Sequence, residues 1–400
     1  MTKERESTYL HCMSQRSARE GEPMFKVWYH DNKAFAEYLV DITDLKKHDP
    51  SIEKLSFGRS FANNPDMIQK ILYLDVPDAI VTYGFPEKPV LGIEFCAEAP
   101  SGHDIFQRVA RVAASASFGT AFAFIFPEKK WVVRTMGGRW DNYNPLSFRA
   151  LMNISRFHKT PTLAFFWEAN QISGDEANGF LLMDKNCANM PDRNSQEMKN
   201  FAAFVNLSID YVLRNRDFEE MMFDPLIMNR EMWMWEKFHQ QYRSKPDTFR
   251  WSPLTSCRII KTSDLVTLVR KAIGREPDLP NYVTEREETL IYEPGTNIFR
   301  SDPYSGSLVG IDYLECRNGE TVRHRHRNLV MHFGKIRFKK MQNMFCRYYK
   351  EECPFNPKIK DVNRYLGLHL RDGCRYTKQK ELRIYCYVAD VLVFKDAALF

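Results

Sequence analysis

The sequence predicts a protein of the mixed α/β class, in which strands and helices follow one another along the chain. Two apolar, strand-like segments, 67–84 and 89–97, are joined by the turn sequence Gly-Phe-Pro-Glu-Lys, which predicts a hairpin. An amphipathic helix is predicted over 101–119, and the apolar run 120–127 is typical of a strand buried on both faces. The order strand, strand, helix, strand therefore predicts a mixed sheet in an α/β core.

Further elements extend this pattern through the chain. In chain order they are a helix over 32–48, strands over 160–170 and 179–186, a helix over 191–215, a short helix over 264–274 and a strand-rich segment over 378–400. The fourth of these begins with Asp192 or Ser195, either of which is a suitable N-cap.

The chain is expected to divide into three parts. Residues 1–25 form a polar arm, 26–215 an α/β core, and 216–400 a second, basic α+β domain. The stretch 218–242, rich in Met and Trp, opens this second domain and is expected to be core or a subunit contact.

Composition excludes several classes of protein. The chain has 400 residues, of which 44% are hydrophobic and 27% charged. It contains no run of roughly 20 apolar residues, so we expect no membrane span. The N-terminal segment is charged and lacks the apolar region of a secretory signal. Nine cysteines at irregular spacing favour a reducing compartment, and a cytoplasmic location is expected.

The basic residues are concentrated near the C-terminus. The net charge is +6, and residues 321–350 contain Lys, Arg and His without a single acid. Such a stretch suits a polyanion, although a solvated basic face is the alternative. Asn318-Gly319 predicts a hairpin whose returning strand carries arginines on one face. The predicted DNA contacts are Arg323, Arg325, Arg327, Lys335, Arg337, Lys339 and Lys340.

Two acids stand out within the apolar hairpin. If the hairpin is symmetric about Pro86, Asp78 pairs with Glu94, and their Cβ atoms lie about 5 Å apart on one face of the sheet. Two carboxylates so close repel each other unless a cation lies between them or one is protonated. A divalent cation such as Mg²⁺ fits, because it is commonly held by one or two carboxylates. Cys96 shares that face, two residues beyond Glu94.

The same segment resembles the PD-(D/E)xK nuclease superfamily, especially type II restriction endonucleases. The matching residues are Pro77-Asp78, the run from Gly92 to Cys96 and the run from Gly102 to Arg111, within roughly residues 65–130. The resemblance implies a restriction-endonuclease-like core over 26–215 in which Asp78 and Glu94 bind Mg²⁺ and Gln107 approaches the site. Gln107 and Arg108 are equally compatible with the polar side of the helix, and Arg111 with pairing to an acid.

One position departs from the family pattern. Cys96 stands where the family has a lysine, and a thiol does not supply a positive charge. Glu98 could complete the site only if the chain bends after Glu94. The other candidates for the missing group are Lys54, Lys129 and Lys130.

These observations predict a Mg²⁺-dependent, site-specific endonuclease that hydrolyses phosphodiester bonds of double-stranded DNA. The predicted catalytic residues are Asp78, Glu94, Cys96, Glu98 and Gln107, and 216–400 would be the DNA-recognition domain. A symmetric target would require a homodimer. Two alternatives stay open: a nucleic-acid-binding protein on a degraded nuclease fold that does not cut, and a carboxylate-pair hydrolase such as a glycosidase.

Overall fold

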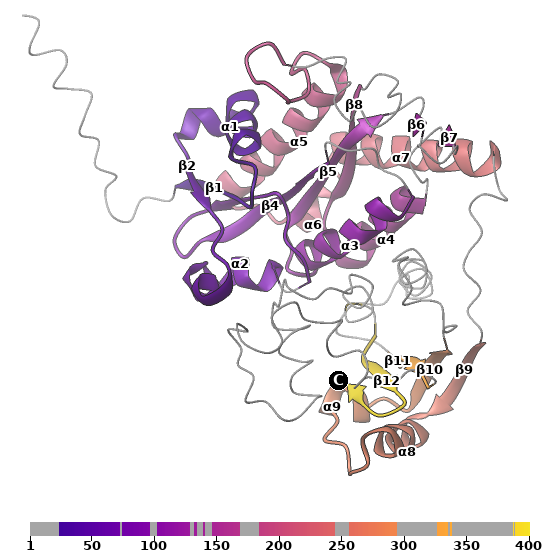
Figure 1. The fold of residues 1–400 in the computed structure, drawn as a ribbon. Helices are drawn as coiled ribbons and strands as arrows, with labels where there is room; N and C mark the ends of the chain where they lie inside the picture. The colour runs from indigo at the N-terminus through magenta and orange to yellow at the C-terminus, as the bar shows by residue number, and fades with distance from the viewer. Residues whose placement is uncertain are drawn as a thin grey trace, which may run out of the picture.

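In the described part of the chain, two larger β-sheets each have helices packed on them, and a third sheet has only two short strands (Figure 1). The structure is a computed structural model. It describes residues 24–72, 74–96, 102–128, 132–133, 139–140, 146–168, 184–244, 256–293, 326–334, 337, 387 and 389–400. The mixed α/β class predicted from the sequence is confirmed. Among the described residues, no helix combines the length and the apolar character needed to cross a membrane.

The N-terminal sheet has six strands in the order β2-β1-β3-β4-β5-β8. They are β1 (Phe25–Tyr29), β2 (Ser51–Lys54), β3 (Ala79–Tyr83), β4 (Lys88–Phe95), β5 (Ala121–Glu128) and β8 (Thr162–Glu168). Strand β3 is antiparallel to β1 and β4, whereas β4, β5 and β8 run parallel to one another. A separate short pair consists of β6 (Val132–Val133) and β7 (Arg139–Trp140).

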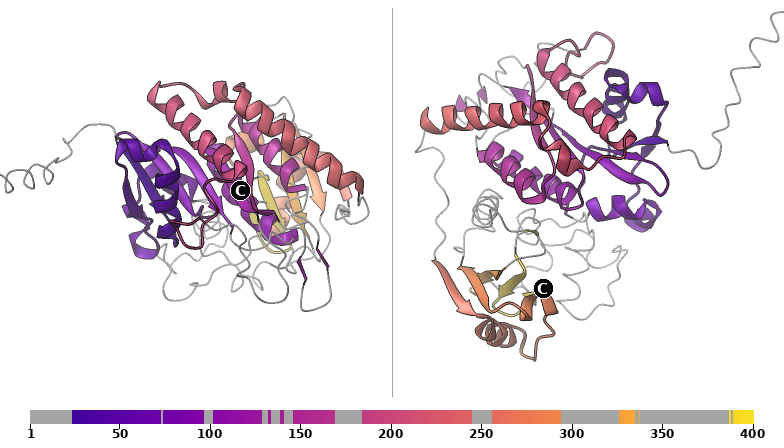
Figure 2. Two further views of the ribbon diagram at one scale, coloured as in Figure 1. Left: turned by 90° about the horizontal axis from the view of Figure 1, so that it is seen from above. Right: turned by 180° about the vertical axis from the view of Figure 1, so that it is seen from behind.

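Helices cover both faces of this sheet (Figures 1 and 2). Helices α3 (Gly102–Ser117) and α4 (Leu146–His158) lie on one face, and α1 (Lys33–Ile42) and α5 (Gln196–Leu213) lie on the other. The predicted order strand, strand, helix, strand is thus observed as β3, β4, α3 and β5. Ser195 is the N-cap of α5, because its side chain accepts a hydrogen bond from the backbone N–H of Met198.

The predicted strand-like segment 67–84 contains a helix as well as a strand. Helix α2 (Asp66–Ile71) precedes β3, and short 3₁₀ helices span Asp44–His48 and Gly58–Asn63. Ile68 and Ile71 are both buried, and their spacing of three residues places them on one side of a helix. The apolar content of the segment was therefore compatible with a strand, but its spacing suits a helix.

The helical layer of the N-terminal sheet continues beyond residue 215, where the sequence placed a domain boundary. Helix α6 (Phe218–Met221) leads into α7 (Pro225–Ser244), and α7 packs against α4 and β8. Trp233 of α7 makes an edge contact with Phe148 of α4 and a tilted ring contact with Phe166 of β8. The Met- and Trp-rich stretch therefore packs against the N-terminal sheet.

The C-terminal sheet has five strands in the order β13-β12-β11-β10-β9. Its elements are β9 (Ser256–Lys261), α8 (Thr262–Ile273), α9 (Asn281–Thr284), β10 (Glu288–Glu293), β11 (Arg327–Phe333), β12 (Val391–Phe394) and β13 (Ala398–Leu399). Strands β10, β11 and β12 are parallel. Leu265 and Val269 of α8 pack on Val330 and Val391 of the sheet and bury one of its faces.

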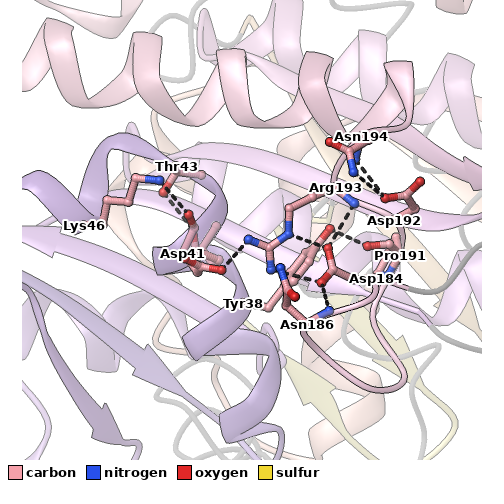
Figure 3. A network of polar contacts seen from close by, with 11 residues as sticks. Tyr38, Asp41, Thr43, Lys46, Asp184, Asn186, Pro191, Asp192, Arg193 and Asn194 are labelled. Carbon is pink, nitrogen blue, oxygen red and sulfur yellow. Dashed lines mark hydrogen bonds and ion pairs between the residues drawn. The ribbon is translucent and has the colours of Figure 1, made fainter.

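A polar network holds the segment before α5 against α1 (Figure 3). Arg193 donates from Nε to Asp184 Oδ2 (2.5 Å) and from Nη2 to Asp184 Oδ1 (3.0 Å), and it also pairs with Asp41 of α1. The hydroxyl of Tyr38 donates to the carbonyl of Pro191 over 2.7 Å. We call Asp41, Asp184 and Arg193 the clamp.

Candidate functional site

The pairing of β3 with β4 places the two predicted acids opposite each other. Ala79 pairs with Ile93 and Ile80 with Gly92, so continuing this register by one residue sets Asp78 across from Glu94. The backbone N–H of Phe95 donates to Asp78 Oδ2 over 2.8 Å. The register shifts by one residue near the turn, after Val81, but this irregularity leaves the pairing at the acids unchanged.

Two arginines of α3 contact the carboxylate of Glu94. Arg108 Nε lies 2.6 Å from Oε1, and Arg111 Nη1 donates to Oε2. Arg111 Nε also lies 3.1 Å from Oδ2 of Asp75, which lies three residues before Asp78 in the loop that leads into β3. The Glu94 side chain is only 1% exposed, and a carboxylate buried to this extent requires such partners. We call Asp75, Asp78, Glu94, Arg108 and Arg111 the site network.

Close packing of α3 on β4 brings these arginines to the acids. Arg108, Arg111 and Ser115 are spaced three and four residues apart, so they share one face of α3. A Cβ atom on Gly92 would lie 2.9 Å from Ser115 Oγ and 2.8 Å from the ring of Phe122. Glycine at this position therefore lets α3 approach β4 closely, and Arg111 is held over Glu94.

Asp78 has an unusual electrostatic environment. Its burial and the nearby charge of Glu94 raise its pKa from 3.8 to about 8, and the opposing effects of Arg111, the Phe95 N–H and Arg108 are smaller. With all its carboxylates ionised, the site network of three carboxylates and two guanidinium groups carries one negative charge in excess, and the raised pKa of Asp78 means that a proton balances this charge near neutral pH. Among the described residues, no cationic side chain lies within ion-pair distance of Asp78. A perturbed carboxylate with this cause is a candidate functional group.

The other predicted catalytic residues are placed only in part. Cys96 is buried directly after β4, where its backbone N–H donates to the carbonyl of Ile125 over 2.8 Å. Cys96 also affects the pKa of Arg108. Burial lowers this pKa, but the electrostatic effects of Cys96, Glu94 and Asp78 outweigh burial, so the net shift is upward. Glu98 and the side chain of Gln107 lie outside the described residues.

The proposed sources of the missing positive charge need correction. Lys54 is at the end of β2, an edge strand that β1 and β3 separate from β4, so it is not beside Glu94. Lys129 and Lys130 lie outside the described residues. The positive charges that contact Glu94 belong to Arg108 and Arg111, and the prediction that Arg111 pairs with an acid is confirmed. Their spacing of three on an amphipathic helix was the signal in the sequence.

The carboxylates of the site network suit a hard divalent cation. Mg²⁺ is commonly held by one or two carboxylates together with water and phosphate oxygens, and Asp78 and Glu94 provide such a pair. In the described part of the chain, no group of three or more His, Cys, Asp or Glu side chains is arranged as a metal site. Both oxygens of Glu94 already accept from Arg108 and Arg111, so this pair of acids could hold Mg²⁺ only if Glu94 Oε1 exchanges Arg108 for the metal.

The basic tract differs from its predicted form where it is described. Residues 327–333 form β11, which has a parallel neighbour on each edge, so the predicted antiparallel hairpin partner does not lie beside this segment. The run from Asn328 to Met331 is buried, as expected of a central parallel strand. The flanking charges concealed this apolar run in the sequence.

The predicted DNA-contacting residues are likewise only partly described. Arg327 starts β11 and pairs with Glu288 over 2.5 Å, so it is not an unopposed charge. Arg337 is exposed. Arg323, Arg325, Lys335, Lys339 and Lys340 lie outside the described residues.

Comparisons with known proteins returned no relatives. No protein-family model matches the chain, and neither the curated proteins nor the solved structures searched contain a match to it.

Proposed function

We propose that the protein is a Mg²⁺-dependent endonuclease for double-stranded DNA, built on a restriction-endonuclease-like core. The observation that carries this proposal is the register of β3 and β4, which sets Asp78 opposite Glu94. Support also comes from the raised pKa of Asp78, which its burial and the neighbouring Glu94 cause, and from the order β3, β4, α3, β5. A homodimer acting on a symmetric DNA site is part of the proposal.

The residues of the site would divide the work as follows. Asp78 and Glu94 would hold Mg²⁺, which polarises the scissile phosphate and lowers the pKa of an attacking water. Arg111 bridges Asp75 and Glu94 and so fixes the orientation of the Glu94 carboxylate. The backbone N–H of Phe95 orients Asp78 in the same way.

A nucleic-acid-binding protein that does not cut is the second candidate. The observation in its favour is that both oxygens of Glu94 accept hydrogen bonds from arginines. If these ion pairs persist when DNA and Mg²⁺ are present, Glu94 is not a metal ligand and hydrolysis is not expected.

Cleavage of a long, sequence-diverse DNA in Mg²⁺ or in EDTA distinguishes the two candidates. We expect discrete fragments from the wild-type protein in Mg²⁺ only, and none from Glu94→Gln. Glu197→Gln is the matched control, because it alters another carboxylate that pairs with an arginine, Arg230, at the β8 edge of the same sheet. Intact DNA that both the wild-type protein and Glu94→Gln retard on a gel would refute the nuclease and favour the binding protein.

A further inference from the structure

A cavity of about 340 Å³ is formed by residues of α5, α7 and β8. Both helices pack against this strand (Figure 1). The described residues that line the cavity are Phe165 of β8, Asn200 of α5, and Leu226, Asn229, Arg230 and Trp233 of α7. The spacing of the last four places them on one side of α7. Small-molecule sites measure roughly 300–1,000 Å³, so a cavity of this size suits a ligand with a single ring system.

The cavity is separate from the site network. Phe165 contacts Phe201 and Phe204 of α5, and α5 covers the face of the sheet opposite to α3. The arginines of the site network lie on α3. A ligand bound in the cavity therefore does not require that the protein is a nuclease.

Among the described lining residues, the one charged side chain is already neutralised. Arg230 is only 7% exposed, and its Nη1 and Nη2 donate to Oε1 (2.9 Å) and Oε2 (2.6 Å) of Glu197. Its Nε donates to the carbonyl of Ala164 over 2.8 Å. An anion in the cavity would lie close to the Glu197 carboxylate and compete with it for the guanidinium. The cavity therefore favours a neutral ligand over a phosphate or a carboxylate.

Planar groups are packed together in the wall. The Cζ atom of Arg230 lies 4.8 Å from the ring centre of Phe165 and 3.9 Å from that of Trp233. Flat heteroaromatic rings bind to such walls, because they stack on aromatic side chains and on guanidinium planes.

Two carboxamides supply the hydrogen bonds of the cavity. The side chain of Asn229 is not hydrogen-bonded to any described residue. Asn200 accepts from Gln196 over 3.0 Å and donates to Glu197 over 3.4 Å, which leaves one of its two N–H donors unused. A ligand that displaces water from these amides must offer both donors and acceptors, since an unpaired polar group is costly to bury.

We propose that this cavity binds the neutral ring of a nucleobase, as a free nucleoside or as an unpaired base of a nucleic-acid strand. A base has a flat face for stacking, and its edge carries donors beside acceptors, which asparagine side chains recognise. Asn200 and Asn229 bind the edge of the base, and the planar groups of Arg230 and Trp233 contact its ring.

Isothermal titration calorimetry with adenosine, guanosine, cytidine and thymidine tests the proposal, with ribose as the control that lacks a base. We expect saturable binding of at least one nucleoside, one molecule per chain, and no binding of ribose. The 5′-monophosphate of the preferred nucleoside should bind with an affinity within about fivefold of that of the nucleoside, because Glu197 already neutralises Arg230.

Variants locate the binding in the cavity. Asn229→Leu and Asn200→Leu should each weaken nucleoside binding by about fivefold, the effect of one lost hydrogen bond. Both should fold, because leucine favours a helix more than asparagine does, and urea unfolding checks this. Gln240→Leu is the matched control: it removes an exposed carboxamide on the same side of α7, about three turns beyond Asn229 and outside the cavity, and should bind as the wild type does.

Three results would overturn the proposal. They are an absence of saturable binding of all four nucleosides, equal affinities of the wild type and both folded asparagine variants, and a monophosphate that binds more than about tenfold tighter than its nucleoside, which would indicate an anion site. A single-stranded oligonucleotide of the preferred base identifies the source of the ligand. Competition with the nucleoside would support an unpaired base of a strand, and a lack of competition would support a free nucleoside.

Discussion

The site network and the clamp are both built from arginines and carboxylates, yet their acids shift in opposite directions. In the clamp, Asp184 accepts two hydrogen bonds from Arg193 and two from backbone N–H groups, and its pKa falls to about 2, chiefly because of the Arg193 bonds. In the site network, burial and the proximity of Glu94 raise the pKa of Asp78 to about 8. Both acids lie in the same unit, so the difference is local.

The number of positive partners explains this difference. In the clamp, Arg193 contacts Asp184 directly, and the more exposed Asp41 shares it at the surface. In the site network, the two guanidinium groups contact Glu94 and Asp75 but do not contact Asp78 within ion-pair distance. The carboxylate of Asp184 is matched by direct partners, whereas Asp78 keeps a perturbed pKa of the kind that is frequent at functional sites.

The largest effect is expected when Arg111 is replaced. Arg111→Met leaves the buried Asp75 and Glu94 without the guanidinium that bridges them. Removing one partner of a buried ion pair costs about 3–5 kcal/mol, because the remaining charge is not compensated. Urea unfolding should therefore give a free energy of unfolding lower by this amount.

The clamp provides the control for this substitution. Arg193→Met should cost less, about 2 kcal/mol, because the buried Asp184 keeps two backbone N–H donors and Asp41 is 55% exposed. Equal losses for the two variants would contradict the distinction between the site network and the clamp.

The local elements could be predicted because their signals are short in range. The turn between β3 and β4 contains Gly84 and Pro86, and with the apolar flanks it defined a hairpin whose register proved correct at the acids. Ser195 was a recognisable N-cap for the same reason. The apolar segment that forms α2 was wrongly interpreted as a strand. In β11, the flanking charges concealed the buried apolar run.

The carboxylates of the site could be predicted from the sequence, but their partners could not. Glu94 interrupts an apolar strand, and a charge at such a position stands out in a sequence. Arg108 lies on an amphipathic helix, where a charged residue usually marks the solvent face. Its contact with Glu94 depends on how closely α3 packs over Gly92, and that is a tertiary property.

A smaller effect should appear when Asp78 is replaced and the pH is varied. Because its folded-state pKa is raised to about 8, the folded protein binds more protons than the unfolded chain between about pH 4 and 8. The contribution of Asp78 to stability is therefore present at low pH and is lost as the pH rises through 8. Between pH 5 and 9, the free energy of unfolding of the wild type should fall by about 2 kcal/mol relative to that of Asp78→Asn. This value is reduced because Asp78 is partly exposed to water. A difference that stays constant over this range in urea unfolding would argue against the raised pKa.

The smallest effect, with the opposite sign, is expected for Asp184 in the clamp. Its folded-state pKa is lowered from 3.8 to about 2, so the unfolded chain binds more protons between these values. The stability that Asp184 provides is present above pH 4 and is lost as the pH falls toward 2. We expect the advantage of the wild type over Asp184→Asn to shrink by about 1 kcal/mol in this window, because water screens the surface part of the clamp. In an Arg193→Met background the pH dependence should become smaller, since the side-chain bonds that are the largest cause of the lowered pKa are then absent and only the two backbone N–H bonds remain. If it persists there undiminished, the Arg193 side chain is not what stabilises the Asp184 carboxylate.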